Sequence, residues 1–67
     1  MTYTLGDNVR AERARAGLTQ DELAERSGIG RVAIAHIEGG TTLSPGLETL
    51  RALAKGLGIP VSRLIGE

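Results

Sequence analysis

Three residues of the types used in nucleophilic catalysis, Ser27, His36 and Glu38, lie close together in the chain. A catalytic triad requires a nucleophile, a base and an acid within hydrogen-bond reach of one another. His36 is expected on the outward face of a helix whose inner face carries Ile34 and Ile37, so the three groups do not converge. The sequence therefore does not predict an enzyme of this class.

The sequence also lacks the residues for a nucleotide-binding motif or a metal site. The segment Gly28-Ile29-Gly30 is followed by a predicted helix, but the strand that a nucleotide-binding motif requires before it is missing. The chain contains no cysteine and one histidine. This excludes a disulfide framework and a zinc finger, and a single His36 cannot form a metal site alone. We expect no cofactor.

The segment between Leu18 and Gly40 carries the strongest local signals in the chain. Thr19 and Glu22 have the spacing of a capping box, in which each side chain accepts a hydrogen bond from the other residue's backbone N–H. Gly28 has no Cβ and can adopt the left-handed conformation that ends a helix. These signals predict a helix that starts after Thr19 and stops at Gly28.

A second helix is expected over residues 31–39, because Ile34 and Ile37 recur there at helical spacing. Two helices, at 20–27 and 31–39, joined by a short turn that contains Gly28 form a helix-turn-helix. In such a motif the second helix is free to lie in a DNA major groove.

From Leu5 to Ile65 the chain resembles the helix-turn-helix family of phage repressors, Cro proteins and their bacterial relatives. The residues that carry the resemblance are Gln20, Ala24, Gly28, Ile34, Ile37, Glu38 and the segment LETLRALAKGLGI. The resemblance implies one all-α, lambda-repressor-like domain over residues 1–67. Its five helices are expected at about 5–16, 20–27, 31–39, 47–57 and 61–65.

The flanking helices show apolar faces of their own. The first is expected to turn Leu5, Val9, Arg13 and Ala16 inward, and residues 1–4 before it are expected to fray, with Tyr3 able to cover an edge of the core. The fourth carries a stripe of Leu47, Leu50, Leu53, Ala54 and Leu57. We predict that this stripe packs under the first and third helices.

Composition limits the partners. Eight basic and eight acidic residues give a net charge of zero, which counts against strong generic affinity for nucleic acid. Tyr3 is the single aromatic residue, so stacking on single-stranded bases is not expected. No apolar run has the length of a membrane helix and no signal-peptide pattern is present, which favours a cytoplasmic protein without membrane contact.

The resemblance implies double-stranded DNA as the partner and places Arg31, Val32, Ala35 and His36 on the reading face. Arg31 can bridge guanine O6 and N7, hold a phosphate, or be only a solvated residue at a helix start. His36 can bond a base or a phosphate, or be an ordinary surface residue. Val32 and Ala35 can contact thymine methyl groups.

Other residues matched to the family are expected to contact phosphate or to build the domain. Gln20 would bind phosphate or support the third helix, although it can also simply fill a helical turn, and Thr41 and Thr42 would contact phosphate. Gly30 departs from the family, which more often has a hydroxyl residue there. Arg13 and Glu38 are matched to an internal ion pair; the alternative is that Arg13 lays its stem over the core with its charge in water.

A single reading helix contacts only a few base pairs, so we expect a homodimer that binds two half-sites of a palindromic site, about one helical turn apart. Apolar residues beyond the needs of the core are expected at Ile59, Val61 and Ile65, with Leu43 as a further candidate. A different class of function remains open, a protein-interaction or antitoxin-like module with a protein partner. It is motivated by the neutral charge and by the apolar Val32, Ala33 and Ala35.

Overall fold

The computed structural model describes residues 4–41 and 45–66, and over these ranges the chain forms helices and no strands. The helices are α1 (Leu5–Arg15), α2 (Gln20–Ser27), α3 (Arg31–Glu38), α4 (Leu47–Leu57) and α5 (Val61–Ile65). The predicted all-α fold is confirmed. Helices α1 and α3 each end one residue earlier than predicted, because Ala16 and Gly39 serve as their C-caps.

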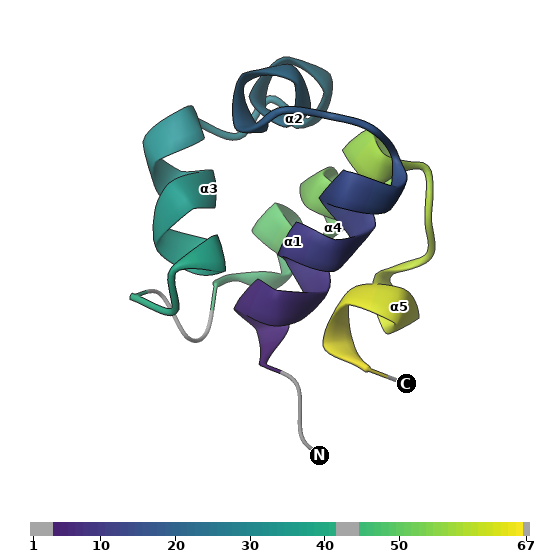
Figure 1. Ribbon diagram of the computed structural model, residues 1–67. Coiled ribbons are helices and arrows are strands. Elements are labelled where there is room, and N and C mark those ends of the chain that lie inside the picture. The colour runs from purple at the N-terminus through teal and green to yellow at the C-terminus, as the bar shows by residue number, and fades with distance from the viewer. Residues whose placement is uncertain (1–3, 42–44, 67) are drawn as a thin grey trace.

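Helix α1 lies across the middle of the domain, with α3 on one side of it and α5 on the other (Figure 1). Helix α2 packs on both α3 and α4, and α4 packs on α5. Helix α4 was predicted to pack under α1 and α3, but its main neighbours are α2 and α5. Its buried residues lie in its second half, and there they share one core cluster with Val9 of α1 and with Ile34 and Ile37 of α3.

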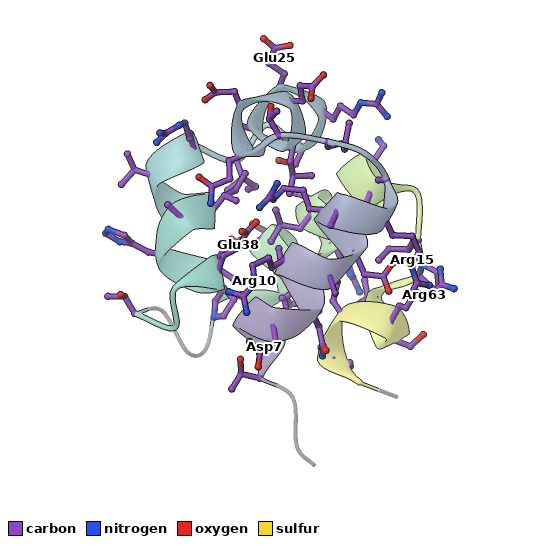
Figure 2. The ribbon with its side chains drawn as sticks, in the orientation of Figure 1. Asp7, Arg10, Arg15, Glu25, Glu38 and Arg63 are labelled. Carbon is purple, nitrogen blue, oxygen red and sulfur yellow. The ribbon has the colours of Figure 1, made fainter. Side chains whose placement is uncertain are left out.

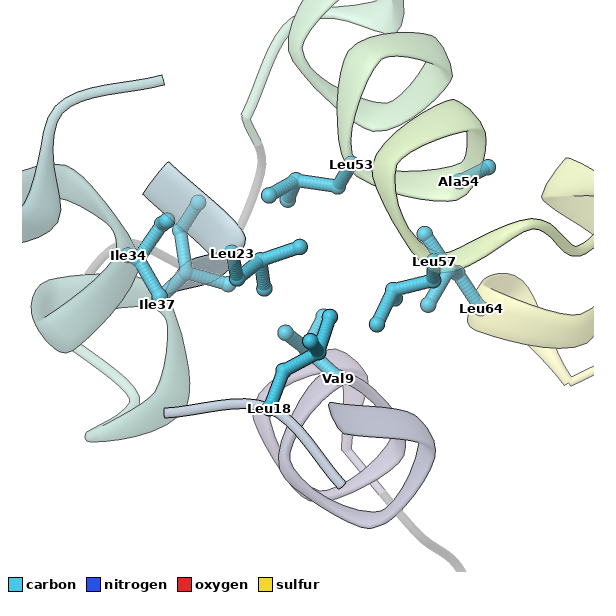
Figure 3. Close-up of a cluster of buried hydrophobic side chains, with 9 residues drawn as sticks. All are labelled: Val9, Leu18, Leu23, Ile34, Ile37, Leu53, Ala54, Leu57 and Leu64. Atoms are coloured by element: carbon cyan, nitrogen blue, oxygen red, sulfur yellow. The ribbon is translucent and has the colours of Figure 1, made fainter. Parts of the chain in front are cut away.

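All five helices contribute to the core, as does the segment between α1 and α2 (Figure 3). The buried apolar residues are Val9, Leu18, Leu23, Ile34, Ile37, Leu53, Ala54, Leu57 and Leu64. Leu47 is an exception to the predicted stripe, since 57% of it is exposed at the first position of α4. Ala16, predicted on the inner face of α1, is also exposed because it lies at the end of that helix.

The start of α1 is capped, so the prediction of fraying was wrong for Thr4. The Thr4 hydroxyl accepts a hydrogen bond from the Asp7 N–H at 3.2 Å, and the Asp7 carboxylate accepts one from the Thr4 N–H at 3.1 Å. The hydrogen bond from the Thr4 backbone holds the pKa of Asp7 below its usual value. Tyr3 lies outside the described residues.

Two glycines set how closely the helices approach. A Cβ on Gly6 of α1 would fall on the carbonyl oxygen of Ile37 and lie 2.9 Å from that of Glu38. A Cβ on Gly56 of α4 would lie 3.1 Å from the Cβ of Ser27 in α2. Both distances are shorter than ordinary carbon contacts, so each glycine permits a helix packing that any larger residue would disturb.

Candidate nucleic-acid interface

Helix α2 begins at the predicted capping box. The Thr19 hydroxyl accepts from the Glu22 N–H at 3.1 Å, and the Glu22 carboxylate accepts from the Thr19 N–H at 2.8 Å. The hydrogen bond from the Thr19 backbone lowers the pKa of Glu22, so the cap is charged at neutral pH. The start of the helix-turn-helix is therefore fixed by local chemistry.

The turn between α2 and α3 is formed by Gly28, Ile29 and Gly30. Gly28 adopts the left-handed conformation with φ of 76° and donates its N–H to the Ala24 carbonyl at 2.9 Å. Ile29 packs against the core, and its N–H donates to the Ser27 hydroxyl at 3.1 Å. The Ser27 hydroxyl thus serves the turn, and α3 is anchored by the turn as well as by its own inner face.

The inner face of α3 is fixed by an ion pair as well as by Ile34 and Ile37. Arg13 of α1 donates from Nε and Nη2 to the two carboxylate oxygens of Glu38, at 2.7 and 2.9 Å. The Arg13 side chain is 19% exposed and that of Glu38 only 4%. The two side chains therefore form the internal ion pair that the family resemblance implied, and the pair is bidentate.

Protonation of this pair is controlled by its neighbours. Burial raises the pKa of Glu38. The hydrogen bonds from Arg13 and Gln20 and the charges of Arg13 and Arg10 lower it by more than burial raises it, so the pKa of Glu38 lies below its usual value. The hydrogen bond to Glu38 raises the pKa of Arg13. Both groups are charged at neutral pH, and every buried side-chain polar atom in the described ranges has a hydrogen-bond partner.

Arg10 makes a contact that the sequence analysis missed. Its Nη1 donates to the backbone carbonyl of Glu38 at 3.2 Å, at the C-terminal end of α3, and its Nη2 pairs with Asp7 at 2.7 Å. Figure 2 shows Arg10 and Glu38 together between α1 and α3. The spacing of Gly6, Arg10 and Arg13 along one side of α1 was the available signal, since all three residues meet the end of α3.

Gln20 supports α3 in the structure. Its amide nitrogen lies 3.3 Å from Oε1 of Glu38, so the first residue of α2 joins the Arg13 and Glu38 pair. The side chain is half-buried. Its predicted contact with phosphate stays a prediction.

The chain leaves α3 through a tight glycine turn. Gly40, with φ of 82°, donates to the Ile37 carbonyl at 3.2 Å, and the Thr41 N–H donates to the His36 carbonyl at 2.9 Å. This pair of bonds is a Schellman motif. The backbone amide of Thr41 is therefore occupied, which leaves its exposed side chain for any contact with phosphate. Thr42 and Leu43 lie outside the described residues.

The outer face of α3 is open to solvent. Arg31, Val32 and His36 are exposed, Val32 to 64%, and Ala35 is half-buried. Arg31 Nε lies 3.0 Å from a carboxylate oxygen of Asp21 in α2, a contact that the sequence analysis did not anticipate. The four residues predicted for the reading face thus lie on one helix, with apolar and cationic groups side by side.

The three residues predicted for a dimer contact differ in exposure. Ile59 and Val61 are half-buried and pack against the core, whereas Ile65 is 46% exposed. Part of the apolar surface expected to be free is used within the domain. Ile65 is the predicted contact residue that remains most accessible.

A helix-turn-helix family model matches residues 9–64. The chain belongs to the XRE-type helix-turn-helix family. The immunity repressor protein of Bacillus phage phi105 is 42% identical over 64 residues, which are 96% of this chain and 44% of the relative. The cryptic phage CTXphi transcriptional repressor RstR of Vibrio cholerae is 37% identical over 59 residues, 88% of this chain and 52% of the relative. The chain thus spans about half the length of these relatives.

Solved structures of similar proteins share the fold of this XRE-type domain. The P22 c2 repressor, crystallised with a synthetic operator, superposes with a TM-score of 0.84 at 33% identity, over 96% of each chain. A variant of the restriction-modification controller protein C.Esp1396I gives a TM-score of 0.81 at 27% identity, over 90% of this chain and 77% of the other. In the described part of the chain, no helix has the length and apolar character to cross a membrane.

Proposed function

We propose that this chain binds double-stranded DNA sequence-specifically, with α3 in the major groove, and acts as a transcriptional regulator. The observation that carries the proposal is the division of α3 into two faces. Ile34, Ile37 and Glu38 bind the helix to the rest of the domain, whereas Arg31, Val32 and His36 face solvent. A helix that is rigidly held and has a free outer face can present side chains to base edges in a fixed register.

The comparisons support this proposal. The P22 c2 repressor, whose crystal contains a synthetic operator, matches over nearly the whole chain. The relatives from phage phi105 and phage CTXphi are repressors by name. Regulation by repression is the biological role most consistent with these likenesses.

The side chains of the outer face supply different kinds of contact. Arg31 offers hydrogen bonds to guanine, His36 to a base or a phosphate, and Val32 and Ala35 offer apolar contact to thymine methyl groups. Gln20, Thr41 and Thr42 are proposed to hold phosphates. The N-cap of α3 is Gly30, so this position has no side-chain hydroxyl either to cap the helix or to bind a phosphate.

The proposed DNA complex is a homodimer. One reading helix contacts only a few base pairs, so two copies on half-sites about one helical turn apart would give useful specificity. Ile65, with 46% of its surface exposed, is proposed as the centre of the contact, with Ile59 and Val61 beside it. Sedimentation equilibrium should show dimers that Ile65→Asp dissociates; a wild-type monomer at high micromolar concentration would reject the dimer.

The central test is selection of bound duplexes from a random pool, followed by fluorescence anisotropy on the selected site and on a scrambled duplex. The proposal expects a clear preference for the selected site at moderate salt, and a palindromic consensus if the dimer binds. Equal affinity for both duplexes would overturn sequence-specific binding.

The size of the salt dependence is a second test. The net charge is zero, Arg31 is the one arginine or lysine of α3, and Arg10 and Arg13 are paired with Glu38, so few phosphates beside α3 can be neutralised. The slope of log affinity against log salt should be shallow, on the order of 3 to 5 per reading head. A much steeper slope would show that phosphate contacts outside this surface dominate.

Replacing Arg31 with Ala distinguishes its two possible contacts. If Arg31 bridges guanine, the loss should be about 1 to 3 kcal/mol and confined to sites with that guanine. If it holds a phosphate, affinity should fall alike on all duplexes and the salt slope should drop by about 1. No change in either quantity would remove Arg31 from the interface.

The exposed Val32 favours one alternative. A valine that is 64% exposed, on a domain with no net charge, also suits an apolar protein partner. An antitoxin-like or regulatory module would co-purify with a stoichiometric partner and show no preference among duplexes. Val32→Ser would then weaken the protein complex and leave DNA measurements unchanged.

A further inference from the structure

An ion pair joins the first turns of the two helices of the helix-turn-helix. Asp21 of α2 and Arg31 of α3 lie 3.0 Å apart, and their side chains are 76% and 56% exposed. We propose that Asp21 is a specificity-determining residue, which positions Arg31 for a base edge and disfavours its use on phosphate. This inference rests on the proposed DNA binding and names a residue beyond the predicted reading face.

The ion pair leaves the two terminal nitrogens of Arg31 available for DNA. The contact to Asp21 is made through Nε of Arg31 and not through either of its terminal nitrogens. Those two nitrogens are the atoms that bridge O6 and N7 of guanine. The Asp21 carboxylate beside Nε therefore restricts the orientation of the guanidinium group and leaves both terminal nitrogens available for guanine.

The charges act in the same direction. Arg31 already has an anionic partner, so a move to phosphate exchanges one anion for another and gains little. A base edge is neutral and does not require Arg31 to leave Asp21. The Asp21 carboxylate also repels a phosphate that approaches Arg31 from the same side. Asp21 should therefore weaken non-specific binding more than specific binding.

Asp21 differs from another acid on the same helix. Glu25 is also exposed on α2, and no ion pair in the described ranges includes it. Figure 2 shows its side chain projecting from α2 away from the rest of the domain. Glu25→Gln and Asp21→Asn each remove one negative charge from α2, so the pair separates a general charge effect from the contact with Arg31.

The experiment measures affinity for the selected and the scrambled duplex at several salt concentrations. It compares the wild type with Asp21→Asn, Glu25→Gln, Arg31→Ala and the double variant Asp21→Asn with Arg31→Ala. Asp21→Asn should lower the ratio of specific to non-specific affinity about two- to fivefold, the range expected for an exposed ion pair. On scrambled DNA it should steepen the salt slope by about 0.9, because Arg31 becomes free to neutralise one phosphate. Glu25→Gln should leave the affinity ratio unchanged.

The double variant ties the effect to Arg31. Once Arg31 is absent, removal of Asp21 should leave the ratio of affinities unchanged. Equal effects of Asp21→Asn and Glu25→Gln, or an Asp21→Asn effect that persists without Arg31, would overturn this inference while leaving DNA binding intact. A wild-type protein with no preference among duplexes would overturn both proposals. NMR of the DNA-free protein checks the contact, because the Arg31 Nε–H signal should shift in Asp21→Asn and not in Glu25→Gln. The backbone amide signals of the same spectra show whether both variants are folded.

Discussion

Two pairs of an arginine with a carboxylate involve α3, one on each side of the helix. On the inner side, Arg13 and Glu38 are 2.7 Å apart, with side chains that are 19% and 4% exposed. On the outer side, Arg31 and Asp21 are 3.0 Å apart and 56% and 76% exposed. Both pairs join a guanidinium to a carboxylate, but the inner pair has two hydrogen bonds and is largely removed from water, whereas the outer pair is a single exposed contact.

Burial decides what each pair can do. A buried carboxylate that loses its cation keeps the cost of its desolvation, so removing one partner of the inner pair should destabilise the domain strongly. Exposed groups are solvated with or without their partner, so the outer pair contributes little to stability and can exchange partners. The inner pair is therefore structural, and the outer pair is available for recognition.

The largest expected effect is that of Arg13→Ala. It leaves Glu38 buried without its bidentate partner and should lower the free energy of unfolding by about 3 to 5 kcal/mol, as judged by urea denaturation. Arg15→Ala is the matched control, because Arg15 is exposed on the same helix. Replacing both partners, Arg13→Met with Glu38→Leu, should restore much of the loss. A loss of less than about 1 kcal/mol in Arg13→Ala would mean that the inner pair contributes no more to stability than an exposed ion pair.

A backbone contact beside the inner pair gives the next effect. Gly6→Ala would place a Cβ against the Ile37 carbonyl and 2.9 Å from the Glu38 carbonyl oxygen. Moving α1 away from α3 would also strain the Arg10 and Arg13 bonds, so a loss of about 1 to 3 kcal/mol is expected. Thermal unfolding would measure it. Unchanged stability would show that α1 can shift without disturbing the inner pair.

The pH dependence of stability should report the inner pair. The folded pKa of Glu38 lies below its ordinary value of 4.5. Its contribution is therefore fully present above pH 4.5 and lost as the pH falls through the folded pKa. Urea titrations across this range should show a steeper loss in the wild type than in the variant with Arg13→Met and Glu38→Leu. Asp7 and Glu22 have pKa values lowered in the same direction, so both proteins should retain the part of the decline that comes from the two caps.

The smallest expected effect concerns the outer pair. Arg31→Ala should change the free energy of unfolding by no more than about 0.5 kcal/mol in urea, whatever it does to DNA binding. High salt should reduce even this difference, because exposed charges are screened. A loss approaching that of Arg13→Ala would place Arg31 among the residues that hold α3, and would weaken the case for its role in recognition.

The sequence by itself determined the elements whose signals are local. The Thr19 and Glu22 capping box and the glycine stop at Gly28 act within a few residues, so both ends of α2 and the start of α3 were predicted correctly, and the end of α3 was placed one residue too late. The same logic would have found the cap at Thr4, had the acid three residues later been the usual glutamate rather than Asp7. The Arg13 and Glu38 pair came from likeness to a family, since nothing local joins residues so far apart.

Tertiary structure alone decided which faces meet. Periodicity identifies an apolar face but gives no partner for it, so the packing of α4 on α2 and α5 and the exposure of Leu47 were not predicted. The contact of Arg10 with the end of α3, and that of Asp21 with Arg31, depend on how whole helices are oriented. Side chains from different helices meet only after the core has fixed those orientations. For this reason the sequence did not predict the contact of Asp21 with the reading face of α3.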